Sequence, residues 1–396
     1  MTDLADPRSD EPHRHREILS AFLKLGFTAF GGPIAHIGYF REEFVNRRRW
    51  LTDTAYADLL ALCQFLPGPA SSQVGFAIGL LRGGFLGALL AWTAFTLPSA
   101  IALMLFALGA GMVTEGIGAE IIGGLKIAAV AVVAHALFGM AKTLTPEPRR
   151  ASIAVLAIAV LALLPGAAGQ IAAIVAGGVA GILALSNDKH NEAGLPPIRI
   201  PEPIALASLG LFAVLLLMAP FLESFGPLTD FLAGIYRAGA LVFGGGHVVL
   251  PLLSAETVAP GFVTRDTFLA GYGAAQAVPG PLFTFAAYLG TQAGGPIWGG
   301  LALVVLFMPG VLLLIGILPF WDSVSSSSRM RSALAGANAA VVGILAAALY
   351  DPVFTSAILG LPSFALAACL FVFLNVWNAP PILVVALAAV GGPFVL

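Results

Sequence analysis

The sequence contains the hexapeptide Gln-Phe-Leu-Pro-Gly-Pro at residues 64–69 and the related hexapeptide Gln-Ala-Val-Pro-Gly-Pro at residues 276–281. Each copy lies inside a long apolar segment, 54–81 or 266–293. Proline has no backbone N–H, and its ring clashes with the preceding helical turn, so a helix must break at each motif. The two copies predict broken helices at equivalent places in an internal repeat.

Other residues repeat at nearly the same distance along the chain. A Phe-Gly-Gly motif at residues 30–32 recurs at residues 243–245, and Lys24 and Arg237 each stand six residues before it. The constant spacing of these matches indicates two related halves. We expect a cytoplasmic tail, a first repeat, a polar proline-rich cytoplasmic linker and a second repeat, with boundaries at 1–16, 17–185, 186–202 and 203–396.

The composition places the chain in a lipid bilayer. Apolar residues make up 59% of the 396 residues, and charged residues make up 10%, against roughly 25% in soluble domains. Apolar runs long enough to cross a membrane recur from residue 18 to residue 396. The predicted fold is an all-α polytopic membrane protein with about 10–13 apolar helices, including broken or re-entrant ones.

The charges of the loops predict that the second half is inverted. Cytoplasmic loops collect Lys and Arg. The acidic loop 111–120 occupies the repeat position of the basic stretch 329–331, and the basic loop 142–150 occupies that of the acidic turn at Asp351. Two inverted structural repeats are a hallmark of secondary transporters.

The sequence leaves the path of the first two segments open. If segments 18–40 and 54–81 each cross once, the loop that carries Arg41 and three further arginines at 47–49 lies outside. If both segments are re-entrant hairpins, that loop stays on the cytoplasmic side, as the distribution of basic loops favours.

The helix breaks suit an anion. A broken backbone at membrane depth is tolerated where it is buried in protein or lines a cavity, and the half-helix that restarts there points its N–H groups and positive dipole end into that space. Ser71, Ser72 and Thr284 follow the breaks, and Gln64 and Gln276 stand about one turn before them. The plain alternative is that the prolines only shape helix packing. The Phe-Gly-Gly motifs have two interpretations of equal weight: they end half-helices, or they allow close helix packing.

Two cations lie within apolar segments, where charge is costly and therefore often functional. Arg237 has a planar guanidinium that suits two oxygens of a tetrahedral anion, and Lys24 is its repeat partner. Both lie near a segment start, so the alternative is an interfacial anchor. His36 and His247 follow their glycine motifs at different distances and are candidates for proton coupling. The sequence predicts no catalytic residues, metal site or cofactor, and no nucleic-acid partner, because it carries no corresponding motif or charge pattern.

These motifs resemble the chromate ion transporter family, in its long two-domain form. The resemblance rests on FGGPIAH at 30–36, QFLPGP at 64–69, FTLPS at 95–99, FGGGH at 243–247 and QAVPGP at 276–281. It implies a multi-pass protein of the bacterial inner membrane that exports chromate and confers chromate resistance. Sulfate or another oxyanion is the alternative substrate, and a membrane scaffold without transport is the alternative class. A homo-oligomer is compatible with this assignment.

The expected substrate site combines the two proline-glycine motifs, the two glycine motifs, the hydroxyls that follow the breaks and the two cations. Its residues are Lys24, Phe30, Gly31, Gly32, Gln64, Pro67, Gly68, Pro69, Ser71, Ser72, Arg237, Phe243, Gly244, Gly245, Gln276, Pro279, Gly280, Pro281 and Thr284.

We expect Pro67→Ala and Pro279→Ala each to reduce transport without abolishing membrane insertion. Alanine restores a helical N–H donor and so favours healing the break that exposes the anion site. The measurement is oxyanion flux in liposomes, normalised to the amount of inserted protein. Wild-type flux in both variants would show that the prolines only shape helix packing.

Overall fold

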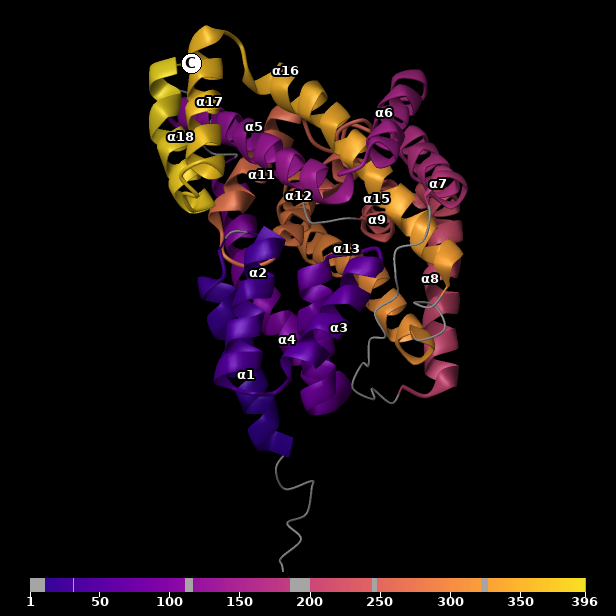
Figure 1. Ribbon diagram of the computed structural model, residues 1–396. Coiled ribbons are helices and arrows are strands. Elements are labelled where there is room, and N and C mark those ends of the chain that lie inside the picture. Colours follow the sequence, from indigo (N-terminus) through magenta and orange to yellow (C-terminus); the bar gives the residue numbers. More distant parts are fainter. Residues whose placement is uncertain are drawn as a thin grey trace, which may run out of the picture.

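The computed structural model describes residues 11–30, 32–110, 117–185, 200–243, 248–321 and 327–395. Every regular element in these ranges is a helix, as predicted (Figure 1). The first half contains α1 (Glu11–Thr28), α2 (Gly32–Arg41), the π-helix η1 (Glu42–Arg47), α3 (Asp53–Phe65), α4 (Ala70–Ala110), α5 (Ile117–Leu144), α6 (Pro148–Leu163) and α7 (Ala167–Ala184). The rest contains α8 (Glu202–Leu222), η2 (Glu223–Phe225), α9 (Pro227–Ala240), α10 (Val249–Thr257), α11 (Arg265–Ala277), η4 (Leu282–Thr284), α12 (Phe285–Gly294), α13 (Pro296–Ile317), η5 (Leu318–Phe320), α15 (Ser328–Ala348), η6 (Leu349–Phe354), α16 (Thr355–Ala357), α17 (Leu361–Asn375) and α18 (Pro381–Val395).

Long apolar helices make the protein a multi-pass membrane protein. Large apolar side chains such as Leu183 on α7 and Leu217 on α8 remain exposed on their outer faces, where lipid would cover them. The apolar helices α6, α17 and α18 are shorter, with 16, 15 and 15 residues. Among the described residues, six helical stretches are long and apolar enough to cross a bilayer: Ala70–Gly109, Glu120–Leu144, Ala167–Ala184, Glu202–Leu222, Pro296–Phe320 and Ser328–Ala357.

The first apolar segment folds back on itself. After α1 ends, the chain reverses, and α2 with η1 returns along the same helix. The ring of Phe22 on α1 lies 4.8 Å from that of Phe44 and 5.8 Å from that of Phe40 (centroid to centroid). The arginine-rich loop after η1 therefore lies at the same face of the molecule as the beginning of α1, which favours the re-entrant alternative.

The second segment is also a hairpin. Thr52 caps α3 by accepting a hydrogen bond from the Ala55 N–H, and the chain then breaks between α3 and α4. The backbone of α4 is non-helical at Gly83 and Gly84, so its first part, 70–82, is a separate half-helix. The guanidinium of Arg82 stacks on the ring of Trp50 at 5.2 Å, which places the two ends of this hairpin at one face.

The second half repeats both hairpins. Helix α11 has 13 residues, like α3, and Thr264 caps it as Thr52 caps α3. Helices α9 and α10 correspond to α1 and α2 with η1, while η4 and α12 correspond to the first part of α4. The hydroxyl of Tyr288 on α12 donates to the Thr267 carbonyl on α11 at 3.0 Å, so these two helices run back along each other.

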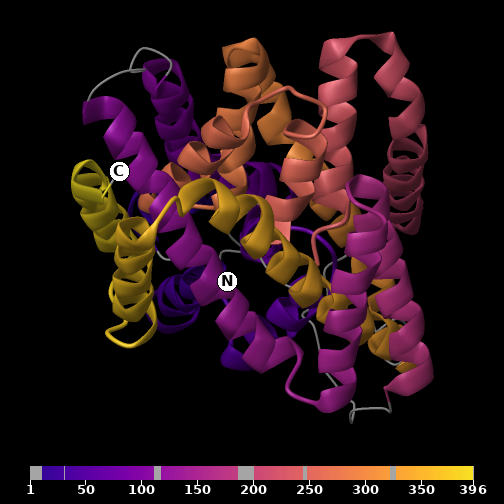
Figure 2. The ribbon, with the colours of Figure 1, turned by 90° about the horizontal axis from the view of Figure 1, so that it is seen from above.

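The remaining helices are exchanged between the repeats. Helix α15 of the second repeat packs along α6 and α7 of the first, whereas α17 and α18 pack along α5 (Figure 2). Glycines allow the helices to approach closely at both contacts. A side chain at Gly336 would collide with the Gly177 carbonyl, and a side chain at Gly124 would collide with the Ala388 carbonyl. Helix α8, which follows the linker in the chain, packs on α9 and α13. The predicted linker, 186–202, falls largely outside the described residues, so the domain boundaries stay predictions.

Polar contacts at the helix ends sort the loops onto two faces. At one face, Ser332 Oγ donates to the Leu185 carbonyl at 3.3 Å, which joins the beginning of α15 to the end of α7. At the other, Arg265 binds Asp351 at 3.0 Å, which joins the beginning of α11 to η6, directly after α15. The first face carries the basic loops identified from the sequence, and basic loops mark the cytoplasmic side.

We expect cysteine labelling to place the repeat-equivalent positions 46 and 259 on opposite sides of the membrane. Both residues are exposed at the bases of hairpins, Asn46 in the last turn of η1 and Ala259 in the turn after α10. In a background with Cys63 and Cys369 replaced by alanine, an impermeant maleimide should label Asn46→Cys and Ser328→Cys from inside, and Ala259→Cys from outside. Labelling of 46 and 259 from one side would contradict the inversion, and labelling of 46 and 328 from opposite sides would contradict the re-entrant hairpins.

Candidate functional site

The four hairpin tips meet through two reciprocal backbone hydrogen bonds. The Gly68 N–H donates to the Val242 carbonyl at 2.7 Å, and the Gly280 N–H donates to the Ala29 carbonyl at 2.9 Å. Ala29 and Val242 are repeat equivalents, as are Gly68 and Gly280. Each proline-glycine tip is therefore held by the tip of the glycine-motif hairpin in the other repeat. We call this meeting of the four tips the crossing.

Glycine is required at the centre of both proline-glycine motifs. Gly68 has φ +126° and Gly280 has φ +97°, values that side chains resist. A Cβ at Gly68 would lie 3.0 Å from the Gly310 Cα, and a Cβ at Gly280 would lie 2.8 Å from the Ser99 Oγ. Gly310 and Ser99 each follow a helix-interior proline, so each tip packs on the proline-containing helix, α13 or α4, of the opposite repeat.

Polar side chains gather where α4 begins. Ser71, Ser72 and Gln73 are 3%, 4% and 1% exposed. Gln73 Nε2 donates to the Pro67 carbonyl at 3.1 Å and to the Gly310 carbonyl at 3.0 Å, so it ties its own tip to α13. Sequence reasoning missed Gln73, although it lies in the same helical turn as the two predicted serines.

The equivalent turn of the second repeat is mostly apolar. Phe283 and Phe285 flank Thr284, whose hydroxyl is committed to the Pro281 carbonyl at 2.7 Å. Gln276 is buried at the end of α11, but its predicted counterpart Gln64 is exposed on α3. The polar groups at the crossing are therefore distributed unequally between the repeats.

Several buried polar atoms near the crossing have no hydrogen-bond partner within the described residues. They are the hydroxyl of Ser72, the hydroxyl of Thr96, the amide nitrogen of Gln276, whose side chain also lies close to the Tyr272 hydroxyl, and the amide oxygen of Gln73. An unsatisfied buried polar group costs about 1–3 kcal/mol. Three of the four can donate a hydrogen bond, and the half-helix beginning at Ala70 adds its positive dipole end. Such a set of donors suits the oxygens of an anion.

His36 lies next to the crossing and is fully buried. Its Nε2 lies 3.1 Å from the Ala29 carbonyl, which also receives the Gly280 N–H, and its Nδ1 lies 3.5 Å from Ser71 Oγ. Because a carbonyl only accepts, Nε2 carries the proton. His36 thus links the tip of the first hairpin to the first turn of α4, a connection that its place in the sequence did not reveal.

The two predicted cations are engaged in ion pairs. Lys24 Nζ lies 3.4 Å from Glu43 Oε2, and Arg237 binds Glu256 through two contacts of 3.0 and 2.6 Å. Both pairs join residues 19 positions apart, and they are repeat equivalents. A search of the repeat for matched opposite charges would have found both acids. The assignment of Lys24 and Arg237 as anion ligands stays a prediction.

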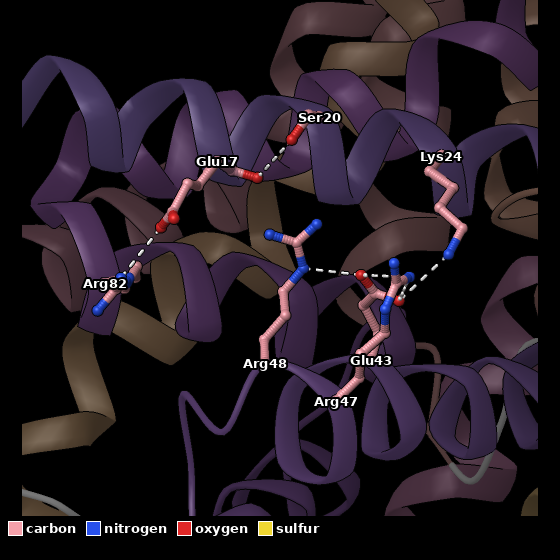
Figure 3. A network of polar contacts seen from close by, with 7 residues as sticks. All are labelled: Glu17, Ser20, Lys24, Glu43, Arg47, Arg48 and Arg82. Atoms are coloured by element: carbon pink, nitrogen blue, oxygen red, sulfur yellow. Dashed lines mark hydrogen bonds and ion pairs between the residues drawn. The ribbon is translucent and has the colours of Figure 1, made fainter.

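Glu43 is the centre of a larger charged network (Figure 3). Arg48 Nε donates to it at 2.7 Å and Arg47 Nη1 at 3.0 Å, in addition to Lys24. Burial disfavours the carboxylate, but hydrogen bonds from Arg48 and Arg47 and the charge of Lys24 outweigh burial, so the pKa of Glu43 lies below its usual value. Glu43 is therefore ionised at neutral pH.

Other predicted residues lie at or near the tips. Phe30, Gly32, Pro67, Pro279 and Phe243 are half-buried, whereas Pro69 and Pro281 are buried. Gly31, Gly244, Gly245 and His247 lie outside the described residues.

The fold and the crossed tips define a polytopic membrane protein with two inverted repeats around a shared polar centre, an architecture that secondary transporters use. The chain belongs to the chromate transporter family, whose profile matches residues 16–182 and again residues 229–393. The two matches leave α8 between them.

Curated relatives extend over most of the chain. A chromate transport protein of Pseudomonas aeruginosa is 29% identical over 98% of this chain and 94% of its own length. A probable chromate transport protein of Synechococcus elongatus is 27% identical over 95% and 94%. A chromate transport protein of Cupriavidus metallidurans is 28% identical over 84% and 81%. No solved structure matches the fold.

We expect Gly280→Ala to impair oxyanion transport much more than Gly295→Ala. Both glycines have positive φ, so both changes add backbone strain of about 1–3 kcal/mol. Only at Gly280 would the new methyl group collide with the other repeat, at Ser99 Oγ and the Phe95 carbonyl. Flux per inserted protein, together with thermal stability in detergent, tests this difference. Equal flux in the two variants would show that the close approach at the crossing is not required.

Proposed function

We propose that this protein is a secondary transporter that exports chromate across the inner membrane of a bacterium. Membership of the chromate transporter family supports the substrate class, and two relatives are named chromate transport proteins. The observation that carries the proposal is the crossing of the four tips, where buried donors without partners stand beside the beginning of a half-helix.

The proposed site fits a tetrahedral dianion. Ser72, Thr96 and Gln276 supply neutral donors, and the N–H groups of the first turn of α4, which have no acceptor within the helix, supply partial positive charge. Weak, distributed donors bind an anion without trapping it, as a carrier requires. We propose that Phe30, Gly32 and Phe243, the described residues of the two glycine motifs, complete the walls of the site.

The membrane potential is sufficient to drive export. Moving two negative charges outward across 100 mV, interior negative, releases about 4.6 kcal/mol, at ~2.3 kcal/mol per charge. At ~1.4 kcal/mol per decade, that energy sustains a gradient of roughly a thousandfold. Export of a dianion therefore does not require ATP, and a proton gradient adds to the driving force where protons are coupled.

Sulfate is the alternative substrate, because it presents the same charge and the same four oxygens. Both anions fit donors placed around a tetrahedron, so the family relationship, rather than the donor set, favours chromate.

We expect expression of the protein in a chromate-sensitive bacterium to lower intracellular chromate. In everted membrane vesicles, chromate should accumulate when an interior-positive potential is imposed, and accumulation should fall when the potential is collapsed. Vesicles with the Gly280→Ala variant serve as the matched control. Unchanged accumulation with the protein present in the membrane would exclude chromate export, and uptake of sulfate in its place would identify the alternative carrier.

A further inference from the structure

Two buried carboxylates occupy repeat-equivalent positions at the bases of the two glycine-motif hairpins. Glu43 is 5% exposed and Glu256 is 6% exposed. Each binds a cation on the first helix of its own hairpin, Lys24 on α1 or Arg237 on α9. Each ion pair therefore joins the outgoing and returning arms of one hairpin.

These hairpins present the carbonyls that hold the opposite tips. The hairpin joined by Glu43 contains Ala29, whose carbonyl receives the Gly280 N–H. The hairpin joined by Glu256 contains Val242, whose carbonyl receives the Gly68 N–H. Fixing the arms of either hairpin therefore also fixes one side of the central crossing.

The two pairs lie at opposite faces because the repeats are inverted. The Glu43 pair stands beside the Glu17–Arg82 ion pair, at the face of the basic loops (Figure 3). The Glu256 pair stands at the end of the hairpin that carries the loop 258–264, at the other face. The first carboxylate has two further arginine partners, whereas a bidentate contact holds the second, and Gly234 leaves room for it.

We propose that Glu43 and Glu256 are positioning residues of the transport cycle, which clamp the cytoplasmic and external hairpins shut in alternation. This inference rests on the proposed transport function. Inverted repeats provide inward-open and outward-open states of similar energy, so a small difference in clamp strength decides which state prevails. Glu256 forms a pair in which both side chains are largely buried, and Glu43 is the buried centre of a network with Lys24, Arg47 and Arg48. Removing either carboxylate leaves its cations without their partner and weakens that hairpin. Glu256→Gln therefore favours the outward-open state, and Glu43→Gln favours the inward-open state.

The test is sided labelling of a cysteine at the crossing. Ala70→Cys marks the beginning of α4, in a background with Cys63 and Cys369 replaced by alanine. An impermeant maleimide is applied to spheroplasts and to everted vesicles, and the ratio of outside to inside labelling rates is measured. Glu256→Gln should raise this ratio about fivefold and Glu43→Gln should lower it about fivefold, equivalent to about 1 kcal/mol at ~1.4 kcal/mol per decade.

Matched variants separate a clamp from general damage. Asp351→Asn removes the exposed Arg265–Asp351 pair and should leave the ratio unchanged. Lys24→Gln leaves Glu43 with Arg47 and Arg48, so it should shift the ratio in the same direction as Glu43→Gln but less. The exchange Arg237→Glu with Glu256→Arg should restore the ratio that Glu256→Gln alone changes.

The outcomes are decisive in either direction. Shifts of the same sign in Glu43→Gln and Glu256→Gln, or no shift in either, overturn the clamps. If Arg237→Gln weakens chromate binding while Glu256→Gln leaves the ratio unchanged, Arg237 is an anion ligand and not part of a clamp. The labelling needs no substrate, so opposite shifts without chromate flux would support the clamps while refuting the proposed function.

Discussion

Two backbone hydrogen bonds, from Gly68 to the Val242 carbonyl and from Gly280 to the Ala29 carbonyl, connect the broken segments at the centre of the molecule. Lipid offers no partners for the N–H and C=O groups of a broken helix, and each unsatisfied group costs several kcal/mol. In this protein, each repeat supplies what the break in the other repeat lacks. The half-helix at Ala70, the buried hydroxyls beside it and the close packing on the proline-containing helices all depend on this reciprocal arrangement.

The symmetry of the backbone does not extend to the side chains at the crossing. Ser71 and Gln73 of the first repeat correspond to Phe283 and Phe285 of the second. His36, which bonds to the carbonyl at the first tip, corresponds to Val249. The two repeats thus share a scaffold, while the first repeat provides most of the polar side chains at the crossing.

The sequence predicted the helical membrane fold, the repeat and the breaks because each depends on local chemistry. Proline, glycine and the capping threonines Thr52 and Thr264 determine the backbone conformation of the residues next to them. The reversal of the first two segments was not predictable in the same way, because an apolar run has the same composition whether it crosses or returns. Gln64 is exposed and Gln276 is buried for a similar reason: the two related motifs meet different neighbours in the folded chain.

Charged partners that meet only after folding were also beyond local patterns. Lys24 and Arg237 were recognisable as unusual cations, but their acids lie 19 residues away, across a turn that the sequence did not show to be a hairpin. The repeat itself contained the missing information, since the residues of both pairs recur together.

Helix α8 has a consequence for the origin of the inversion. Between the second hairpin and the end of α7, the described part of the first repeat contains four helices, from the second part of α4 to α7, so the chain returns to the face where it began. A second copy joined directly would have the same orientation as the first. One additional crossing, Glu202–Leu222, changes the parity and turns the second copy over. In a fused duplication of this kind, the orientation of half the protein is thus determined by whether the connecting piece holds an odd or an even number of membrane spans.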